Sequence, residues 1–279
     1  MRIENNGLRL NGEARNIKHP KKGHLLMKDF TIGAQLYTIR DYLGSKDEVL
    51  KSLKKLKAIG LKALEVSSLA SVSDKEFAAM LEGEGFARIA VHEDGKRVLE
   101  DPQNVLERLA VFNAPYAVYP WPHSSPKTKS DFFALAKALD KSGAALAKGG
   151  KTLLYHNHAL EFERFGKRTA LEIIYGECAT ENLKAELDTH WVQYGGGNPV
   201  EWCKRMKGRL AVLHAKDFGV TGQQIKFMEV GSGNLDWKGI LKAAKAAGCK
   251  TVVIEQDTCP GDPFYSIKKS FEFLSSLQA

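Results

Sequence analysis

From Thr31 onward, short apolar runs alternate with longer amphipathic segments along the chain. Eight apolar runs have the length and composition of buried strands, at residues 32–36, 63–66, 87–91, 116–119, 152–155, 185–187, 210–213 and 251–254. Eight segments between and after them have the apolar spacing of helices, at residues 46–59, 73–83, 102–112, 129–148, 169–178, 199–206, 237–247 and 263–277. The pattern therefore predicts eight strand–helix units.

The ends of the predicted helices agree with this interpretation. Ser45 and Asp236 stand where N-caps are expected, and Gly60 and Gly248 stand where C-terminal glycines are expected. Eight such units imply parallel strands with right-handed crossovers that close into a barrel. An open doubly wound sheet would usually carry a glycine-rich phosphate turn after the first strand, and residues 35–40 contain no glycine. The predicted fold class is α/β, a single-domain (β/α)8 TIM barrel over residues 29–279.

Charge is distributed unevenly along the 279 residues, which carry a formal net charge of +8. Residues 1–28 hold seven basic and two acidic side chains, a net +5, so the remaining 251 residues carry only +3. We expect residues 1–28 to be a flexible N-terminal extension, with a start at Met27 as the alternative. The nearly balanced body predicts no nucleic-acid partner.

Composition and cysteine usage narrow the class of protein further. Hydrophobic residues make up 43% of the chain, enough for a sizeable core. No apolar run approaches the roughly 20 residues that a membrane-spanning helix needs, and the first residues lack the apolar core of a secretory signal. The four cysteines form no CxxC pair, which predicts reduced thiols. We therefore expect a cytoplasmic protein with no membrane partner.

Polar residues end four consecutive predicted strands, namely His156, Asp188, His214 and Glu255. The active site of a TIM barrel lies at the C-terminal ends of its strands. Since strand side chains alternate between faces, His156 and His158 point to the same side. Two imidazoles and two carboxylates suit one divalent ion such as Mn, Co, Zn or Fe(II). The alternatives are that the histidines are structural and that Asp188 only caps the following helix.

Polar and aromatic residues near the strand ends are candidates for binding a substrate: Gln35, Tyr37, Arg40, Glu65, His92, Trp121, His190 and Trp191. The tryptophans suit the walls of a sugar site, with core packing as the alternative. His158, Glu255 and Lys216 are the candidate catalytic groups for proton transfer. The segment Gly231-Ser232-Gly233 predicts a turn, either over the site or without a role in it. No GxSxG, P-loop or HExxH motif is present, which excludes the corresponding chemistries.

Six stretches carry a resemblance to a known family. They are IGAQLYTIRD (32–41), LLYHNH followed by EFERF (153–165), ELDTHWVQYGG (186–196), VLHAKDF (212–218), VGSGNLDWKGIL (230–241) and VIEQD (253–257). Together they resemble the xylose-isomerase-like TIM barrels, the sugar phosphate isomerase/epimerase group, over nearly all of residues 30–277. The resemblance implies a metal ion held at the ends of strands five to eight, with the last three ligands at Asp188, His214 and Glu255.

One position departs from the pattern of that family. Where its members have a glutamate within a Glu-Asn-His stretch, this chain has His156. The epimerases of the family use that glutamate as one of two opposed acid/base carboxylates, so the replacement favours a likeness to inosose dehydratases, which also carry a His-rich fifth strand. Trp191 stands where many members have a further histidine, which argues against a trinuclear zinc nuclease site.

The residues and the resemblance together predict a metal-dependent isomerase, epimerase or lyase, with manganese among the suitable ions. The substrate is expected to be a sugar, keto-sugar or cyclitol that loses a proton next to a carbonyl. A catalytically silent sugar-binding barrel and, less favoured, an abasic-site endonuclease are the alternatives. The sequence leaves the substrate and the homo-oligomeric state open.

Overall fold

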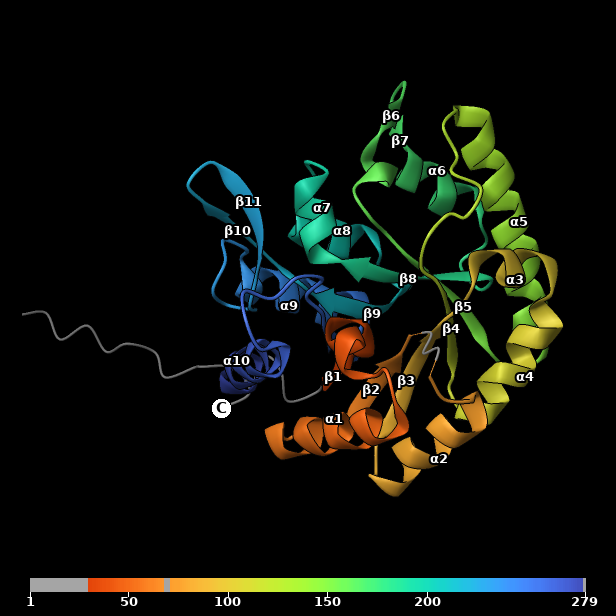
Figure 1. The fold of residues 1–279 in the computed structure, drawn as a ribbon. Helices are drawn as coiled ribbons and strands as arrows, with labels where there is room; N and C mark the ends of the chain where they lie inside the picture. Colours follow the sequence, from red (N-terminus) through yellow and green to blue (C-terminus); the bar gives the residue numbers. More distant parts are fainter. Residues whose placement is uncertain (1–29, 68–70, 278–279) are drawn as a thin grey trace, which may run out of the picture.

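Eight parallel strands close into a barrel in the computed structural model, which describes residues 30–67 and 71–277 (Figure 1). The strands are β1 (Thr31–Gln35), β2 (Ala63–Val66), β3 (Ala87–His92), β4 (Tyr116–Tyr119), β5 (Thr152–His156), β8 (Leu183–Asp188), β9 (Leu210–Ala215) and β12 (Thr251–Ile254). They pair in chain order, and β1 pairs with β12 to close the barrel. The predicted fold class is confirmed, whereas the extension predicted for residues 1–28 lies outside the described residues.

Helices surround the strands at every predicted position (Figure 1). They are α1 (Lys46–Ile59), α2 (Asp74–Gly83), α4 (Pro102–Phe112), α5 (Lys129–Lys148), α6 (Ala170–Glu177), α8 (Pro199–Arg205), α9 (Trp237–Ala247) and α10 (Pro263–Ser276). Ser45 caps α1 through its side chain, and Gly60 ends the helix at φ 106°, a left-handed conformation that favours glycine. The caps therefore set the helix limits as the sequence predicts.

Several short elements follow the C-terminal ends of the strands and were not predicted. They are η1 (Leu36–Tyr42), α3 (Gly95–Glu100), η2 (Leu160–Phe162), α7 (Thr189–Tyr194) and the hairpins β6 (Arg164–Phe165) with β7 (Arg168–Thr169) and β10 (Asp217–Thr221) with β11 (Gln224–Met228). Most are too short to show a hydrophobic period. They stand around the end of the barrel where the predicted site lies, so they shape its mouth.

The barrel interior changes from apolar to polar along its axis. An apolar layer is formed by Ala63, Ile89, Ala90, Val118, Leu154, Val212 and Val253. Side chains alternate along a strand, so the residue two positions after an interior residue also points inward. Two positions after the last apolar interior residue of β5, β9 and β12 stand His156, His214 and Glu255. A second apolar core lies between the strands and the helices. The polar layer is therefore carried on a rigid apolar base.

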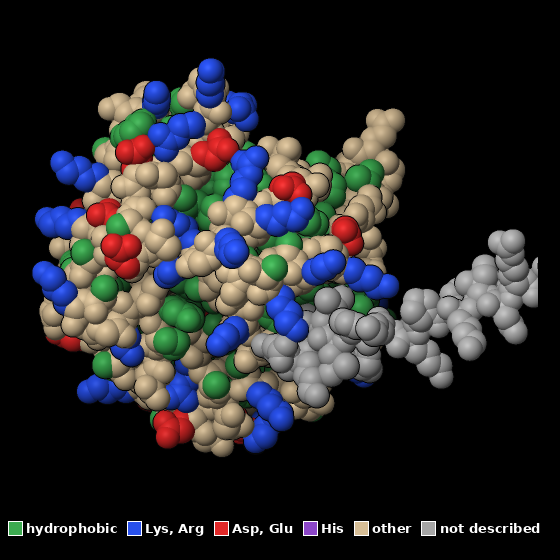
Figure 2. Space-filling view, turned by 180° about the vertical axis from the view of Figure 1, so that it is seen from behind, with side chains coloured by type: hydrophobic (Ala, Val, Ile, Leu, Met, Phe, Trp, Pro, Cys, Tyr) green, Lys and Arg blue, Asp and Glu red, His purple; other side chains and the backbone are tan. Residues whose placement is uncertain are grey.

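The surface gives two further observations. On the face opposite to that of Figure 1, lysine and arginine side chains are scattered with acidic groups among them (Figure 2). Within residues 30–67 and 71–277, no helix combines the length and hydrophobicity needed to cross a bilayer.

Candidate metal centre and pocket

The four predicted metal ligands converge at the C-terminal end of the barrel. The ligand atoms of His156, Asp188, His214 and Glu255 all lie within 4.8 Å of one another, and all four residues are buried. Asp188 also caps α7, since its Oδ1 accepts the N–H of Trp191 at 2.9 Å. Its Oδ2 accepts no hydrogen bond from any residue that the structure describes. The cap and a ligand role are therefore compatible, because they use different oxygens.

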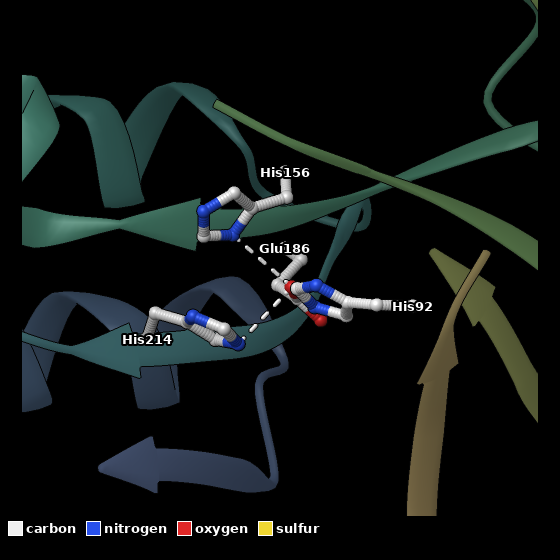
Figure 3. A group of neighbouring side chains, drawn as sticks. All are labelled: His92, His156, Glu186 and His214. Atoms are coloured by element: carbon white, nitrogen blue, oxygen red, sulfur yellow. Dashed lines mark hydrogen bonds and ion pairs between the residues drawn. The ribbon is translucent and has the colours of Figure 1, made fainter. Parts of the chain in front are cut away.

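A second group of four overlaps the first and includes a residue that the sequence reading missed (Figure 3). It consists of His92, His156, Glu186 and His214, again with ligand atoms within 4.8 Å. Oε1 of Glu186 lies 2.9 Å from Nε2 of His92, 3.1 Å from Nδ1 of His156 and 3.0 Å from Nε2 of His214. Glu186 was detectable, because it precedes Asp188 by two residues on the same strand face.

Glu65 completes the carboxylates around these rings. Its Oε2 lies 2.6 Å from Nε2 of His214 and accepts a hydrogen bond from Nε2 of Gln35 at 2.9 Å. Gln35 and Glu65, both predicted to bind substrate, are thus fully buried neighbours of the cluster. His92 stands 3.5 Å from Glu65, with its ring stacked on that of His214.

Burial and mutual charge set the protonation of this inner group. Burial opposes ionisation, but Glu65 and Glu186 outweigh it and raise the pKa of His92 to about 10 and that of His214 well above its usual value. Burial raises the pKa of Glu186, whereas the two histidines hold the pKa of Glu65 well below its usual range. Burial lowers the pKa of His156. The carboxylates are therefore balanced by imidazolium protons, which a divalent ion can replace.

Lys216 places a buried ammonium beside the outer carboxylates. Its Nζ lies 2.6 Å from Oδ1 of Asp257, 3.2 Å from Oε2 of Glu255 and 3.5 Å from Oδ2 of Asp188. Burial acts against ionisation, but Lys216 and His214 lower the pKa of Glu255. Burial raises the pKa of Asp188 to about 7 despite Lys216. The Lys216–Glu255 pair therefore combines a protonated amine with an ionised carboxylate.

A cavity of about 490 Å³ opens above these groups. It is lined by Tyr37, Ser67, His92, Pro120, Trp121, His156, His158, Trp191, Lys216, Glu255 and Asp257. The ring of His158 lies between Trp121 and Trp191, at centroid distances of 4.7 and 5.5 Å. Burial and the charge of Lys216 lower the pKa of His158 to about 3. His158 is therefore a neutral group on an aromatic wall.

Two predicted substrate residues lie away from this cavity. Arg40 stacks on the ring of Tyr37 at 4.3 Å and lines a neighbouring cavity together with Asp257. His190 is buried against Phe227 at 4.3 Å. The structure thus brings Tyr37, His92, Trp121 and Trp191 to the cavity, with Gln35 and Glu65 beside the candidate metal ligands.

One further buried acid supports the site from behind. Glu161 accepts a hydrogen bond from the hydroxyl of Tyr155 at 2.8 Å and another from the backbone N–H of His158 at 2.8 Å. Burial raises the pKa of Glu161 to about 7. Glu161 therefore fixes the backbone at His158, a role that the sequence did not suggest.

The fold and the polar cluster define a TIM barrel whose candidate site lies at the C-terminal ends of its strands. The chain matches the family model described as "Xylose isomerase-like TIM barrel" over residues 36–277, and it belongs to this family. The resemblance seen in the sequence is confirmed.

Solved structures share the fold over nearly their whole length. A sugar phosphate isomerase/epimerase from Parabacteroides distasonis has a TM-score of 0.74 at 20% identity, covering 87% of this chain and 92% of that one. The probable 3-DHS dehydratase AsbF from Bacillus anthracis has a TM-score of 0.68 at 11% identity, covering 88% and 99%. The IolI protein, solved with a zinc atom, has a TM-score of 0.67 at 14% identity, covering 89% and 98%. No curated protein matches the sequence.

Proposed function

We propose that this protein is a divalent-metal-dependent isomerase, epimerase or dehydratase that acts on a sugar, keto-sugar or cyclitol. The observation that carries the proposal is the overlap of candidate metal ligands and proton-transfer groups at the floor of one cavity. Structures with the same fold include a sugar phosphate isomerase/epimerase, a probable dehydratase and a protein with bound zinc. A small-molecule substrate fits a cavity of this size.

The donor set fits a divalent ion that tolerates nitrogen ligands, such as Zn, Mn, Co or Fe(II). His156 and His214 belong to both candidate groups, and Asp188 and Glu255 complete the group predicted from sequence. Oδ2 of Asp188 accepts no hydrogen bond within the described residues and has only the ammonium of Lys216 at 3.5 Å, so it is an acceptor that an ion would satisfy. When bound, the ion supplies Lewis acidity that polarises a substrate carbonyl.

Three residues of the cavity are candidates for proton abstraction, charge stabilisation and proton transfer to a hydroxyl. Glu255 is ionised and is the candidate base for the proton next to the carbonyl. The ammonium of Lys216 donates hydrogen bonds to the oxygen on which negative charge develops. His158 is neutral and borders the same cavity, so it is the candidate for transferring a proton to or from a hydroxyl. Delivery of a proton to the opposite face of the same carbon gives epimerisation, and delivery to the former carbonyl carbon, with the hydroxyl proton moved to the other oxygen, gives isomerisation. Loss of the β-hydroxyl as water gives dehydration.

The aromatic walls favour a ring or chain with apolar C–H faces. Trp121 is 51% exposed at the cavity, and Trp191 flanks the opposite side of His158. Large exposed aromatic side chains beside polar groups suit a carbohydrate, whose C–H faces pack on rings while its hydroxyls form hydrogen bonds. This arrangement supports a sugar or cyclitol over a planar or purely apolar ligand.

The test is exchange of the α-proton in deuterated water, followed by NMR over a panel of keto-sugars and inososes with Mn, Co or Zn supplied. We expect exchange with at least one substrate, abolished by chelation and reduced at least about 100-fold in Glu255→Gln and Lys216→Met. The exposed Glu201→Gln serves as the matched carboxylate control and should exchange normally. Binding of a panel member without any exchange would instead identify the catalytically silent sugar-binding barrel, which the His156 replacement motivates.

A further inference from the structure

The loop after the seventh barrel strand uses its backbone donors on a carboxylate of the chain itself. In many TIM barrels a phosphate group binds the loops after the seventh and eighth strands and the N-terminus of a helix beside them. The seventh strand here is β9, and Asp217 follows its last residue by two positions. The oxygens of Asp217 accept the backbone N–H groups of Phe218, Gly231, Gly233 and Leu235. These donors are therefore not available to a phosphate.

The helix after the eighth strand begins with an acid in the same way. α10 follows β12, and Oδ1 of its N-cap Asp262 accepts the N–H of Phe264 at 2.9 Å. The carbonyl oxygen of Asp262 accepts the N–H groups of Tyr265 and Ser266. A carboxylate at a helix N-terminus also opposes the binding of a second anion there. Both usual positions for a phosphate thus carry an acid of the chain.

The charges around the cavity also disfavour a phosphate. Five acids surround its floor, namely Glu65, Glu186, Asp188, Glu255 and Asp257. Among the described residues that line the cavity, Lys216 is the only lysine or arginine, and its Nζ lies 2.6 Å from Oδ1 of Asp257. A divalent ion, bound as proposed above, displaces protons from the histidines, so five carboxylates then face three positive charges. A phosphate dianion would therefore be repelled.

Two atoms on the cavity wall suit an uncharged hydroxyl instead. Nε1 of Trp191 and Nδ1 of His158 are buried and, in the part of the chain that the structure describes, have no hydrogen-bond partner. Both side chains line the cavity, and their ring centroids lie 5.5 Å apart. A hydroxyl donates one hydrogen bond and accepts two, so it can pair with the indole N–H and with either tautomer of the histidine.

We propose that the substrate is an uncharged sugar or cyclitol rather than a sugar phosphate, and that Asp257 sets this preference. The inference rests on the proposed function and names the class of its substrate. Asp257 lines both the main cavity, which contains Lys216, and the neighbouring cavity of about 370 Å³, which contains Arg40. Its carboxylate therefore offsets the charge of the two cations that a phosphate would use.

Matched pairs of substrates test the preference. D-Fructose, D-tagatose, L-ribulose and D-xylulose are each compared with their terminal phosphate esters by α-proton exchange in deuterated water, with Mn²⁺, Co²⁺ or Zn²⁺ supplied. We expect at least one uncharged sugar to exchange with a kcat/KM at least about 100-fold above that of its ester. An ester that exchanges as fast as its uncharged partner, or faster, would overturn the inference and leave the proposed function standing.

Asp257→Asn removes the charge and keeps the size of the side chain. We expect the ratio of the two kcat/KM values, uncharged sugar over ester, to fall at least about tenfold in this variant. A displaced Lys216 would slow both members of a pair alike, so the ratio separates charge from position. The exposed Glu201→Gln is the control and should keep the wild-type ratio. An unchanged ratio in Asp257→Asn would overturn its role in specificity.

Binding gives a second readout that needs no turnover. Trp121 is 51% exposed at the cavity, so the fluorescence of the purified full-length protein reports an occupant, with Trp121→Phe as control. Uncharged sugars that bind more tightly than their esters, even without exchange, support the inference. Tighter binding of the esters, lost in Arg40→Gln, would place a phosphate in the neighbouring cavity and overturn it. A panel in which nothing binds or exchanges would overturn this inference and the proposed function together.

Discussion

Two buried carboxylates on neighbouring segments of the barrel mouth, Asp217 and Glu186, have opposite surroundings. The oxygens of Asp217 accept five hydrogen bonds at 2.7–3.3 Å, from the N–H groups of Phe218, Gly231, Gly233 and Leu235 and from the indole of Trp237. Glu186 has three imidazoles at one oxygen and, among the described residues, no hydrogen bond at the other. The difference separates an acid whose hydrogen bonds organise a loop from an acid that keeps one oxygen open for a further donor.

The hydrogen bonds of Asp217 explain the segment Gly231-Ser232-Gly233, whose role the sequence analysis left open. Asp217 begins the hairpin β10–β11 and binds the chain again where it approaches α9. Gly231 has φ 86°, and a Cβ on Gly233 would lie 2.4 Å from Oδ1 of Asp217. The glycines are therefore required for the close approach to this carboxylate, and the turn is an anchored structural connection.

The largest effect in this comparison is expected for Asp217→Ala. It leaves five donors without their acceptor in a buried loop, so we expect the free energy of unfolding to fall by at least about 4 kcal/mol. For a protein of this size that corresponds to a Tm lower by roughly 10 °C. Thermal and urea unfolding measure it, with the exposed Asp41→Ala as control. A loss below about 1 kcal/mol would show that solvent replaces the carboxylate, contrary to our interpretation.

Glu161 is a third buried acid, intermediate between Asp217 and Glu186. It accepts hydrogen bonds from Tyr155 and His158, but burial raises its pKa to about 7. The folded state then binds the proton more tightly than the unfolded chain, so stability falls as pH rises from about 4.5 to about 7. Between pH 4 and pH 8 this carboxyl should cost roughly 3 kcal/mol, a cost that Glu161→Gln removes.

The measurement for Glu161 is urea unfolding of both proteins at pH 5 and pH 8. Other groups titrate equally in both, so the difference between the two curves reports this carboxyl. Parallel pH profiles for the wild-type protein and Glu161→Gln would mean that the acid stays ionised throughout and that its pKa is not raised.

The fold was predictable because long periodic segments carry most of it. The limits of α1, α4, α5 and α9 agree with the sequence pattern, since amphipathic spacing and capping residues coincide there. The six-residue α7 and the largely exposed hairpin β10–β11 lack such a signal. These are the elements that shape the mouth, so the periphery of the site was the least predictable part.

The candidate site was predictable where strand alternation alone decides the direction of a side chain. His156, His214 and Glu255 follow from this rule. Glu186 obeys it too, but it lies inside the run at residues 185–187 rather than at its end, so the search for polar residues at strand ends does not find it. His190 was placed at the substrate because it follows β8, yet α7 begins at Thr189 and its first turn carries the ring against other aromatic side chains. The alternation rule for strands does not predict the direction of a side chain that lies in a helix starting directly after the strand.

Glu186→Gln tests the unsaturated side of the comparison through stability. Zn²⁺ at about 100 times its Kd should stabilise the wild-type protein by about 2.7 kcal/mol, because the ion binds the folded state only. Because Glu186 contacts the rings of His156 and His214, we expect Glu186→Gln to reduce this Zn²⁺-dependent shift in Tm, and Glu255→Gln, which removes a proposed ligand, to reduce it more. A shift in Glu186→Gln equal to that of the wild type would show that Glu186 does not support the ion.

Two tryptophans make the final and smallest test, because the indole N–H of one donates to Asp217, whereas that of the other, on the cavity wall, has no acceptor among the described residues. Nε1 of Trp237 donates to Asp217 at 2.7 Å, whereas Nε1 of Trp191 is buried and, in residues 30–67 and 71–277, has no acceptor. Trp237→Phe should therefore cost about 2 kcal/mol, and Trp191→Phe should change the free energy of unfolding by less than about 0.5 kcal/mol, since it removes a donor that was already unsatisfied. Urea unfolding compares them directly. Equal losses would show that ring volume rather than hydrogen bonding decides, and that the hydrogen bond from Trp237 to Asp217 adds no measurable stability.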